Sequence, residues 1–147
     1  AIPGKYYGTL PAPTRKGYTF AGWYTSPAGG VKVSRQSKVA NKNITLYAHW
    51  TKVKVAKAKK PGVKSISKKK AKVTIKRVKN AYGYQICYST KKNMSGAKKK
   101  VTKKLSKTLT GLKSKKKYYV KVRAFKKDST GNRVYGKWSA VKAVKIK

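Results

Sequence analysis

The chain has 147 residues, and its 41 lysines and arginines stand against a single acidic residue, Asp128, for a formal net charge of +40. Paired carboxylates, metal cages of Asp and Glu, and Ser-His-Asp triads all need acids that this chain lacks, so the composition argues against an enzyme. The charge favours polyanions as partners.

The rest of the composition predicts a folded protein with a cationic exterior. Hydrophobic residues make up 39% of the chain, with 11 Tyr and 3 Trp, which is enough apolar material for a core. The lone Cys87 and the lone His49 exclude an internal disulfide and a cysteine-based zinc site. We therefore expect no cofactor and no metal, and a monomer, because like charge repels a second copy.

Charge is distributed unevenly along the chain. Residues 1–51 hold seven of the basic residues, residues 52–60 hold five, and residues 61–147 hold the other 29. Residues 52–60 alternate Lys with Val or Ala before a Pro-Gly pair, which predicts an extended, flexible linker between two domains. The predicted domains are therefore 1–51 and 61–147.

The second half shows the periodicity of an all-β sandwich. Segments rich in Val, Ile, Thr and Tyr recur there at roughly ten-residue spacing. They cover residues 73–78, 82–89, 99–104, 107–112, 118–125 and 140–147. In 118–125, Val120, Val122 and Ala124 share one face, while Lys121 and Arg123 share the other. This alternation predicts a buried face and a charged face.

Residues 7–50 carry a distinctive set of short motifs. They are GYTFAGWY at 17–24, Gly-Gly at 29–30 and LYAHW at 46–50. This segment resembles the Listeria–Bacteroides repeat, the internalin-type B-repeat of bacterial surface proteins. The resemblance implies a small β-grasp-like fold, found in extracellular arrays, with structural roles for Trp23, Trp50 and His49. The family's usual first strand is absent before Tyr6, so we expect a repeat that lacks that strand, within a longer parent protein.

Residues 61–147 resemble a lysine-rich bacterial fibronectin type III domain. The motifs are AYGYQI at 81–86, the run from Leu112 to Ala124, and YGKWS at 135–139. The resemblance implies a seven-stranded immunoglobulin-like sandwich with structural roles for Tyr84, Tyr118 and Trp138. Tyr118 would be the tyrosine corner, its hydroxyl bonding upstream backbone. The family's second-strand Trp is replaced by Ile75.

The lysine clusters of the second half are the candidate polyanion-binding residues. Several lysines together neutralise phosphate or sulfate groups with a salt-sensitive, sequence-blind affinity. An alternative reading is a solvated surface that resists aggregation and protects edge strands. The predicted set, with two cations of the 118–125 strand, is Lys68, Lys69, Lys70, Lys98, Lys99, Lys100, Lys103, Lys104, Lys115, Lys116, Lys117, Lys121 and Arg123.

Other conspicuous residues are given structural or incidental roles. Tyrosines and tryptophans among the lysines could stack on bases or sugars, but core packing accounts for them better. Cys87 is expected to point outward beside Gln85, as a reactive, crosslinking-prone thiol. Asp128 lies in a turn-forming sequence, 126–132, and is expected to cap the turn.

These observations predict a non-catalytic spacer and adhesion fragment of a secreted or cell-wall-associated, extracellular bacterial protein. Its expected partners are anionic polymers: cell-wall teichoic acid, or sulfated and sialylated host glycans such as glycosaminoglycans and mucin. One alternative is sequence-blind binding of nucleic acid or anionic membrane by a naturally supercharged or engineered cationic protein. Another is a purely structural stalk.

Overall fold

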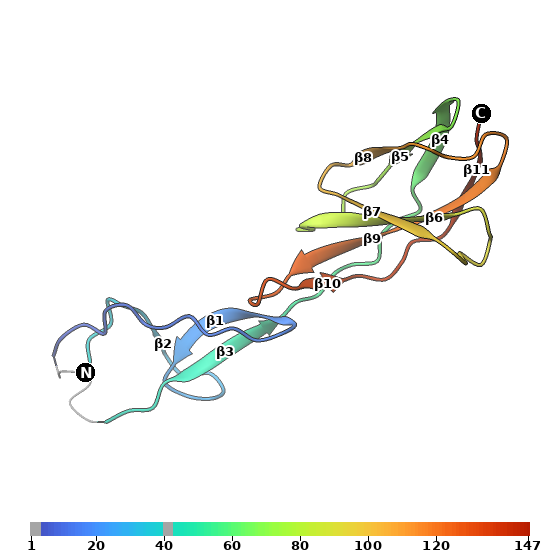
Figure 1. Cartoon of the computed structure of the whole chain (residues 1–147). Coiled ribbons are helices and arrows are strands. Elements are labelled where there is room, and N and C mark those ends of the chain that lie inside the picture. Colours follow the sequence, from blue (N-terminus) through green and yellow to red (C-terminus); the bar gives the residue numbers. More distant parts are fainter. Residues whose placement is uncertain (1–3, 40–42) are drawn as a thin grey trace. The chain divides into compact units, whose positions relative to one another are not determined.

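The computed structural model describes residues 4–39 and 43–147 (Figure 1). These residues form strands and turns without a helix, which confirms the all-β prediction. The chain divides into two compact units. Unit 1 holds the described residues up to Val53 together with Lys127–Asn132, and unit 2 holds Lys54–Lys126 and Arg133–Lys147.

Unit 1 contains an antiparallel sheet with the strand order β2-β1-β3. Its strands are β1 (Tyr18–Tyr24), β2 (Lys32–Val33) and β3 (Tyr47–Lys52). The register between β1 and β3 shifts between Phe20 and Gly22. Gly22 has a φ of 131°, and a Cβ there would lie 2.7 Å from the Lys32 side chain, so this irregularity requires glycine.

Aromatic contacts between partly buried rings join the two longer strands of unit 1. The Phe20 ring meets the rings of Trp23 and Trp50 edge-on, each at 5.6 Å between centroids. The segment before β1 runs antiparallel to residues 35–39, with a bridge from Tyr6 to Lys38. Backbone that precedes β1 therefore finds its hydrogen-bond partners in the stretch that follows β2.

Unit 2 is built from a five-stranded and a three-stranded sheet. The five-stranded sheet has the order β10-β9-β6-β7 with β11 also on β9, and the smaller sheet has the order β4-β5-β8. The strands are β4 (Gly62–Ser67), β5 (Lys70–Thr74), β6 (Gly83–Ser89), β7 (Lys98–Thr102), β8 (Ser106–Leu109), β9 (Lys117–Lys127), β10 (Arg133–Tyr135) and β11 (Lys142–Lys145). Backbone bonds from Gly136 to Ala124 and from Ser139 to Val122 bridge the gap between β10 and β11. Counted as one interrupted strand, these two give the expected seven.

The core of unit 2 follows the alternation of the sequence. On β9, Val120, Val122 and Ala124 are at most 1% exposed, while Lys121 and Arg123 stay partly exposed. Ile86 of β6 pairs with Val122 and is fully buried. Full burial of such a side chain stabilises the fold by about 1.5–3 kcal/mol, so the hydrophobic core can offset charge repulsion.

Residues 54–60 belong to unit 2 and pack against it. Ala58 is 3% exposed and lies in the core, and Val55 packs against that core from its edge. The lysines of this segment stay exposed. The expectation of a flexible linker is therefore wrong, because Val55 and Ala58 pack on the core of unit 2 while the lysines remain in solvent.

Candidate functional site: the cationic surface

Most of the predicted polyanion-binding residues lie in turns and on a sheet edge. All eleven lysines in runs are exposed. Lys68 and Lys69 form the turn between β4 and β5, and Lys103 and Lys104 lie in the turn between β7 and β8. Residues 98–100 lie on β7, the edge strand of the five-stranded sheet. Lysines on an edge also deter pairing with another chain, so both readings of these clusters fit the fold.

The fold brings two of the lysine clusters together. The Lys69 carbonyl accepts a hydrogen bond from the Leu112 amide at 3.1 Å, and the Lys69 amide donates to the Lys147 carbonyl at 3.0 Å. The Lys115 amide donates to the Ile146 carbonyl at 2.8 Å. The 68–70 and 115–117 runs therefore share one end of unit 2, which concentrates positive charge there.

Four members of the predicted set contact aromatic rings of the fold. In the exposed runs, Lys103 lies 4.3 Å from the Tyr82 ring and donates to its hydroxyl at 3.0 Å, and Lys117 lies 5.6 Å from the Tyr119 ring. Arg123 lies 4.3 Å from the Trp138 ring and 3.7 Å from the Tyr135 ring, and its Nε donates to Gln85 Oε1 at 2.8 Å. Lys121 lies 4.6 Å from the Trp138 ring. Cations over aromatic faces stabilise the fold, so these four side chains are less available to a ligand than the other predicted lysines, and Trp138 has a structural role.

Tyr84 and Tyr118 use their hydroxyls on backbone amides. The Val78 amide donates to the Tyr84 hydroxyl, and the Lys113 amide donates to the Tyr118 hydroxyl, both at 2.9 Å. Both tyrosines are buried. The bond at Tyr118 is the upstream backbone contact that the fibronectin resemblance implies for a tyrosine corner.

The aromatic residues singled out in the repeat are also in structural contacts. Trp23 Nε1 donates to the Pro11 carbonyl at 2.8 Å. His49 stacks on Tyr24, with ring centroids 3.8 Å apart, and its Nε2 lies 2.7 Å from the Ser26 carbonyl oxygen. These contacts give both residues a role in shaping unit 1.

The only acidic side chain caps its own turn. The Asp128 carboxylate accepts hydrogen bonds from the amide and hydroxyl of Thr130, from the Asn132 amide and from the Gly17 amide. The Thr130 hydroxyl, and next the Gly17 amide, lower the pKa of Asp128 to about 2. Three of these four donors, on Thr130 and Asn132, lie in the same turn as Asp128, as the turn-capping prediction expected. The fourth donor, the Gly17 amide, lies outside that turn.

Cys87 lies on the outer face of its strand, as predicted, but the expectation of an accessible, reactive thiol there is wrong. Cys87 is 3% exposed and unpaired. Its register partners are Lys99 on β7 and Lys121 on β9, whose side chains emerge on the same face of the sheet. Long lysine stems cover apolar surface while their charge stays in water. The thiol is therefore buried on the charged face of the sheet and out of reach of solvent.

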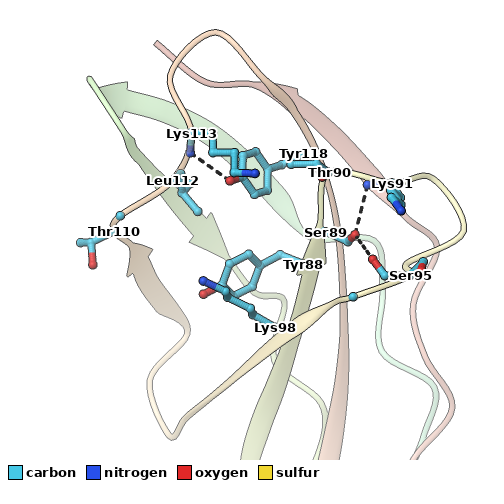
Figure 2. A pocket seen from close by; sticks show the side chains of 12 residues that line it. Tyr88, Ser89, Thr90, Lys91, Ser95, Lys98, Thr110, Leu112, Lys113 and Tyr118 are labelled. Atoms are coloured by element: carbon cyan, nitrogen blue, oxygen red, sulfur yellow. Dashed lines mark hydrogen bonds between the residues drawn. The ribbon is translucent and has the colours of Figure 1, made fainter.

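A pocket of about 290 Å³ brings together lysines that the sequence did not single out (Figure 2). Lys91 and Lys113 line it with Lys98, and the buried rings of Tyr88 and Tyr118 lie at its inner side, 6.4 Å apart. Burial, and next the neighbouring Tyr118, raise the pKa of Tyr88. Of these lysines only Lys98 belongs to a predicted cluster. The sequence feature that could have pointed to Lys91 and Lys113 is their position in loops that contain Ser, Thr and Gly.

The described residues show neither a metal site nor a membrane-spanning helix. Across residues 4–39 and 43–147, no three His, Cys, Asp or Glu side chains come together as a metal ion would need. In the same part of the chain, no helix has the length and apolar character needed to cross a membrane.

The topology of unit 2 is that of a fibronectin type III domain. The sixth such domain of human fibronectin type III domain containing protein 3 is 20% identical, with a TM-score of 0.52, over 65% of this chain and 89% of that one. The fibronectin type III domain of human contactin 1 gives the same identity and TM-score over 65% of this chain and 78% of that one. At this identity the likeness establishes the fold.

The first part of the chain is identified by its sequence. Residues 3–49 match the family model of the Listeria–Bacteroides repeat domain, which confirms that resemblance. Internalin H of Listeria monocytogenes serovar 1/2a is 52% identical over 42 residues, or 28% of this chain. The matched segment spans 8% of that relative's length. The repeat and the fold together indicate a surface or adhesion-type module.

Proposed function

We propose that this chain is a non-catalytic spacer and adhesion fragment of a secreted or cell-wall-associated bacterial protein. Its cationic surface would bind polyanions, namely teichoic acid or sulfated and sialylated glycans. The internalin-type repeat supports the surface setting. The fibronectin type III fold supports the spacer role, since such domains supply rigid, compact units.

One observation carries the binding proposal. Eleven lysines in runs are exposed on unit 2, while the only acidic side chain of the protein, Asp128, is engaged with four hydrogen-bond donors. These lysines therefore lack a side-chain carboxylate to pair with. A polyanion that neutralises them releases its own condensed counterions, which favours binding.

The residue type indicates low selectivity. An ammonium group is a flexible point charge and lacks the planar, bidentate geometry of a guanidinium. The exposed runs consist of lysine, and the Arg123 guanidinium is held between Trp138 and Tyr135. We therefore expect affinity to follow the charge density of the polymer more than its sequence or stereochemistry.

The test is retention on immobilised heparin and teichoic acid over a range of NaCl concentrations. With six or more contacts, affinity should fall roughly 10³-fold or more between about 50 and 200 mM salt. Replacing residues 68, 70, 116 and 117 with Gln should weaken retention, and the same positions changed to Arg should preserve it. Retention that is unchanged at high salt would overturn the electrostatic mechanism.

The alternatives give different outcomes in the same assay. Single-stranded DNA and vesicles of anionic phospholipid, compared at matched salt, test the nucleic-acid and membrane readings. Stronger binding to either of these than to glycans of equal charge density would favour that reading. If the protein binds none of these polyanions at low salt, the purely structural stalk becomes the favoured function.

A further inference from the structure

The pocket beside Tyr88 and Tyr118 draws three lysines from three separate segments of unit 2. Lys91 lies in the loop after β6, Lys98 opens β7, and Lys113 lies between β8 and β9 (Figure 2). We propose that this pocket binds one anionic sugar unit, a pyranose bearing a sulfate or carboxylate group. The proposal rests on the polyanion binding proposed above and names its specific site.

Strand register directs Lys98 into the pocket. Lys98 pairs with Tyr88 across the β6–β7 ladder, and paired residues project their side chains on the same face of a sheet. Tyr88 projects into the core, so Lys98 shares that side at the end of the strand. Lys99 pairs with Cys87 and projects on the opposite face. Of these two adjacent lysines, only Lys98 therefore projects on the side of the sheet where the pocket lies.

Hydrogen bonds hold the two loops in place. The Lys113 amide donates to the Tyr118 hydroxyl at 2.9 Å, which fixes the start of that segment against a pocket residue. In the other loop, the Ser89 hydroxyl accepts from the Lys91 amide at 3.1 Å and donates to the Ser95 carbonyl at 2.7 Å. Both anchors use groups of the chain itself, so the fold holds the two loops in place.

Size and chemistry select an anionic sugar. The volume of about 290 Å³ lies near the lower end of small-molecule sites, roughly 300–1,000 Å³. It suits a single sugar unit, not a stretch of polymer. The three lysines attract the anion, and the polar residues Thr90 and Thr110 are also among those that line the pocket. Tyr88 and Tyr118 are 5% and 8% exposed, so they present ring edges without the open face that base stacking needs.

The experiment is an NMR titration of the whole chain with a sulfated heparin disaccharide at physiological salt. We expect saturable shifts of the Gly96 and Gly111 amides, which line the pocket. Replacing Lys91, Lys98 and Lys113 together with Gln should weaken this affinity at least about tenfold, since charge-assisted hydrogen bonds are lost. A matched variant with Lys64, Lys72 and Lys76 changed to Gln removes the same charge elsewhere and should change it less than about twofold.

The outcomes separate this site from the general proposal. Shifts spread over all lysine-bearing surfaces, with equal losses in the two variants, would overturn the pocket while heparin retention still supports polyanion binding. Loss of heparin retention in the unaltered chain would instead refute the general proposal. Inorganic sulfate that binds the pocket as tightly as the disaccharide would overturn the sugar part of the assignment. Because the shifts are mapped on the unaltered chain, a variant that fails to fold does not decide the result.

Discussion

The carboxylate of Asp128 accepts a hydrogen bond from the backbone amide of Gly17 at 2.8 Å, across 111 positions of sequence. Gly17 has a φ of 81°, in the left-handed region that favours glycine. Next to Asp128, Ser129 exchanges hydrogen bonds with the backbone amide and carbonyl of Arg15. The turn that the sequence predicted as a local feature is thus also part of unit 1.

The position of Asp128 predicts a simple acid transition. The pKa of its carboxyl falls from 3.8 to about 2 on folding, so the folded form binds fewer protons between these values. Its contribution to stability is fully present above pH 3.8 and is lost as the pH falls through about 2. Denaturant unfolding measured from pH 5 to pH 1.5 should show this decline.

Asp128→Asn provides the matched control. It keeps the size and one acceptor oxygen of the side chain but removes its titration. Asp128 is the only acidic side chain, so the variant should lose the side-chain contribution to the pH dependence, and any chain-terminal contribution remains in both proteins. Identical pH profiles for the two proteins would contradict the assigned hydrogen bonds.

Arg123 is predicted to stabilise the fold although it adds to the net positive charge. Arg123→Met retains an apolar stem but removes the contacts with Trp138 and Tyr135 and the bond to Gln85. The free energy of unfolding should fall by about 1–3 kcal/mol. Lys137→Met removes an equal charge from an exposed site and should change it by less than about 0.5 kcal/mol. Equal effects, or a more stable Arg123 variant, would show that charge repulsion dominates.

The fold of unit 2 was predictable because apolar residues alternate with charged ones along β5 and most of β9. Val120, Val122 and Ala124 indicated one buried face, and the structure buries them. Alternation in the sequence does not predict whether the outer face of a strand is covered by side chains of the neighbouring strands. Cys87 and Gln85 were expected in solvent for that reason, but the side chains of neighbouring strands bury them. Such coverage depends on register, which pairs residues far apart in sequence.

The lysine runs were predictable as a surface, but the pocket was not. Lysine-rich turns are visible in the sequence because charge clusters are local. Lys91 and Lys113 are 22 positions apart, and they reach one pocket only after β6, β7 and the segment before β9 have assembled. The burial of Ala58 was missed for a similar reason, since a small side chain gives a weak hydrophobic signal beside four lysines.

Cys87 is predicted to react slowly in the folded protein. A thiol that is 3% exposed must wait for local or global opening before a reagent reaches it. Modification by a thiol reagent should be at least about 100-fold slower in native buffer than in denaturant. A Cys87→Ser variant carrying Thr108→Cys, at an exposed position on β8, should react rapidly in both conditions. Fast reaction of Cys87 itself in native buffer would contradict its burial.

The burial of Tyr88 predicts that the protein loses stability at alkaline pH, as Asp128 predicts a loss of stability at acid pH. Burial, and then the neighbouring Tyr118, raise its pKa above 10, so the folded form keeps this proton longer than the unfolded chain. The resulting stability is fully present below pH 10 and is lost as the pH rises through the folded-state pKa. Lysines also titrate in this range, but Tyr88→Phe leaves them unchanged, so the difference in unfolding free energy between the two proteins isolates Tyr88. Tyr6→Phe alters a tyrosine that is 64% exposed and should follow the unaltered chain. If Tyr6→Phe and Tyr88→Phe shift the alkaline profile alike, the hydroxyl of Tyr88 is solvated, and the pocket is more open than the structure indicates.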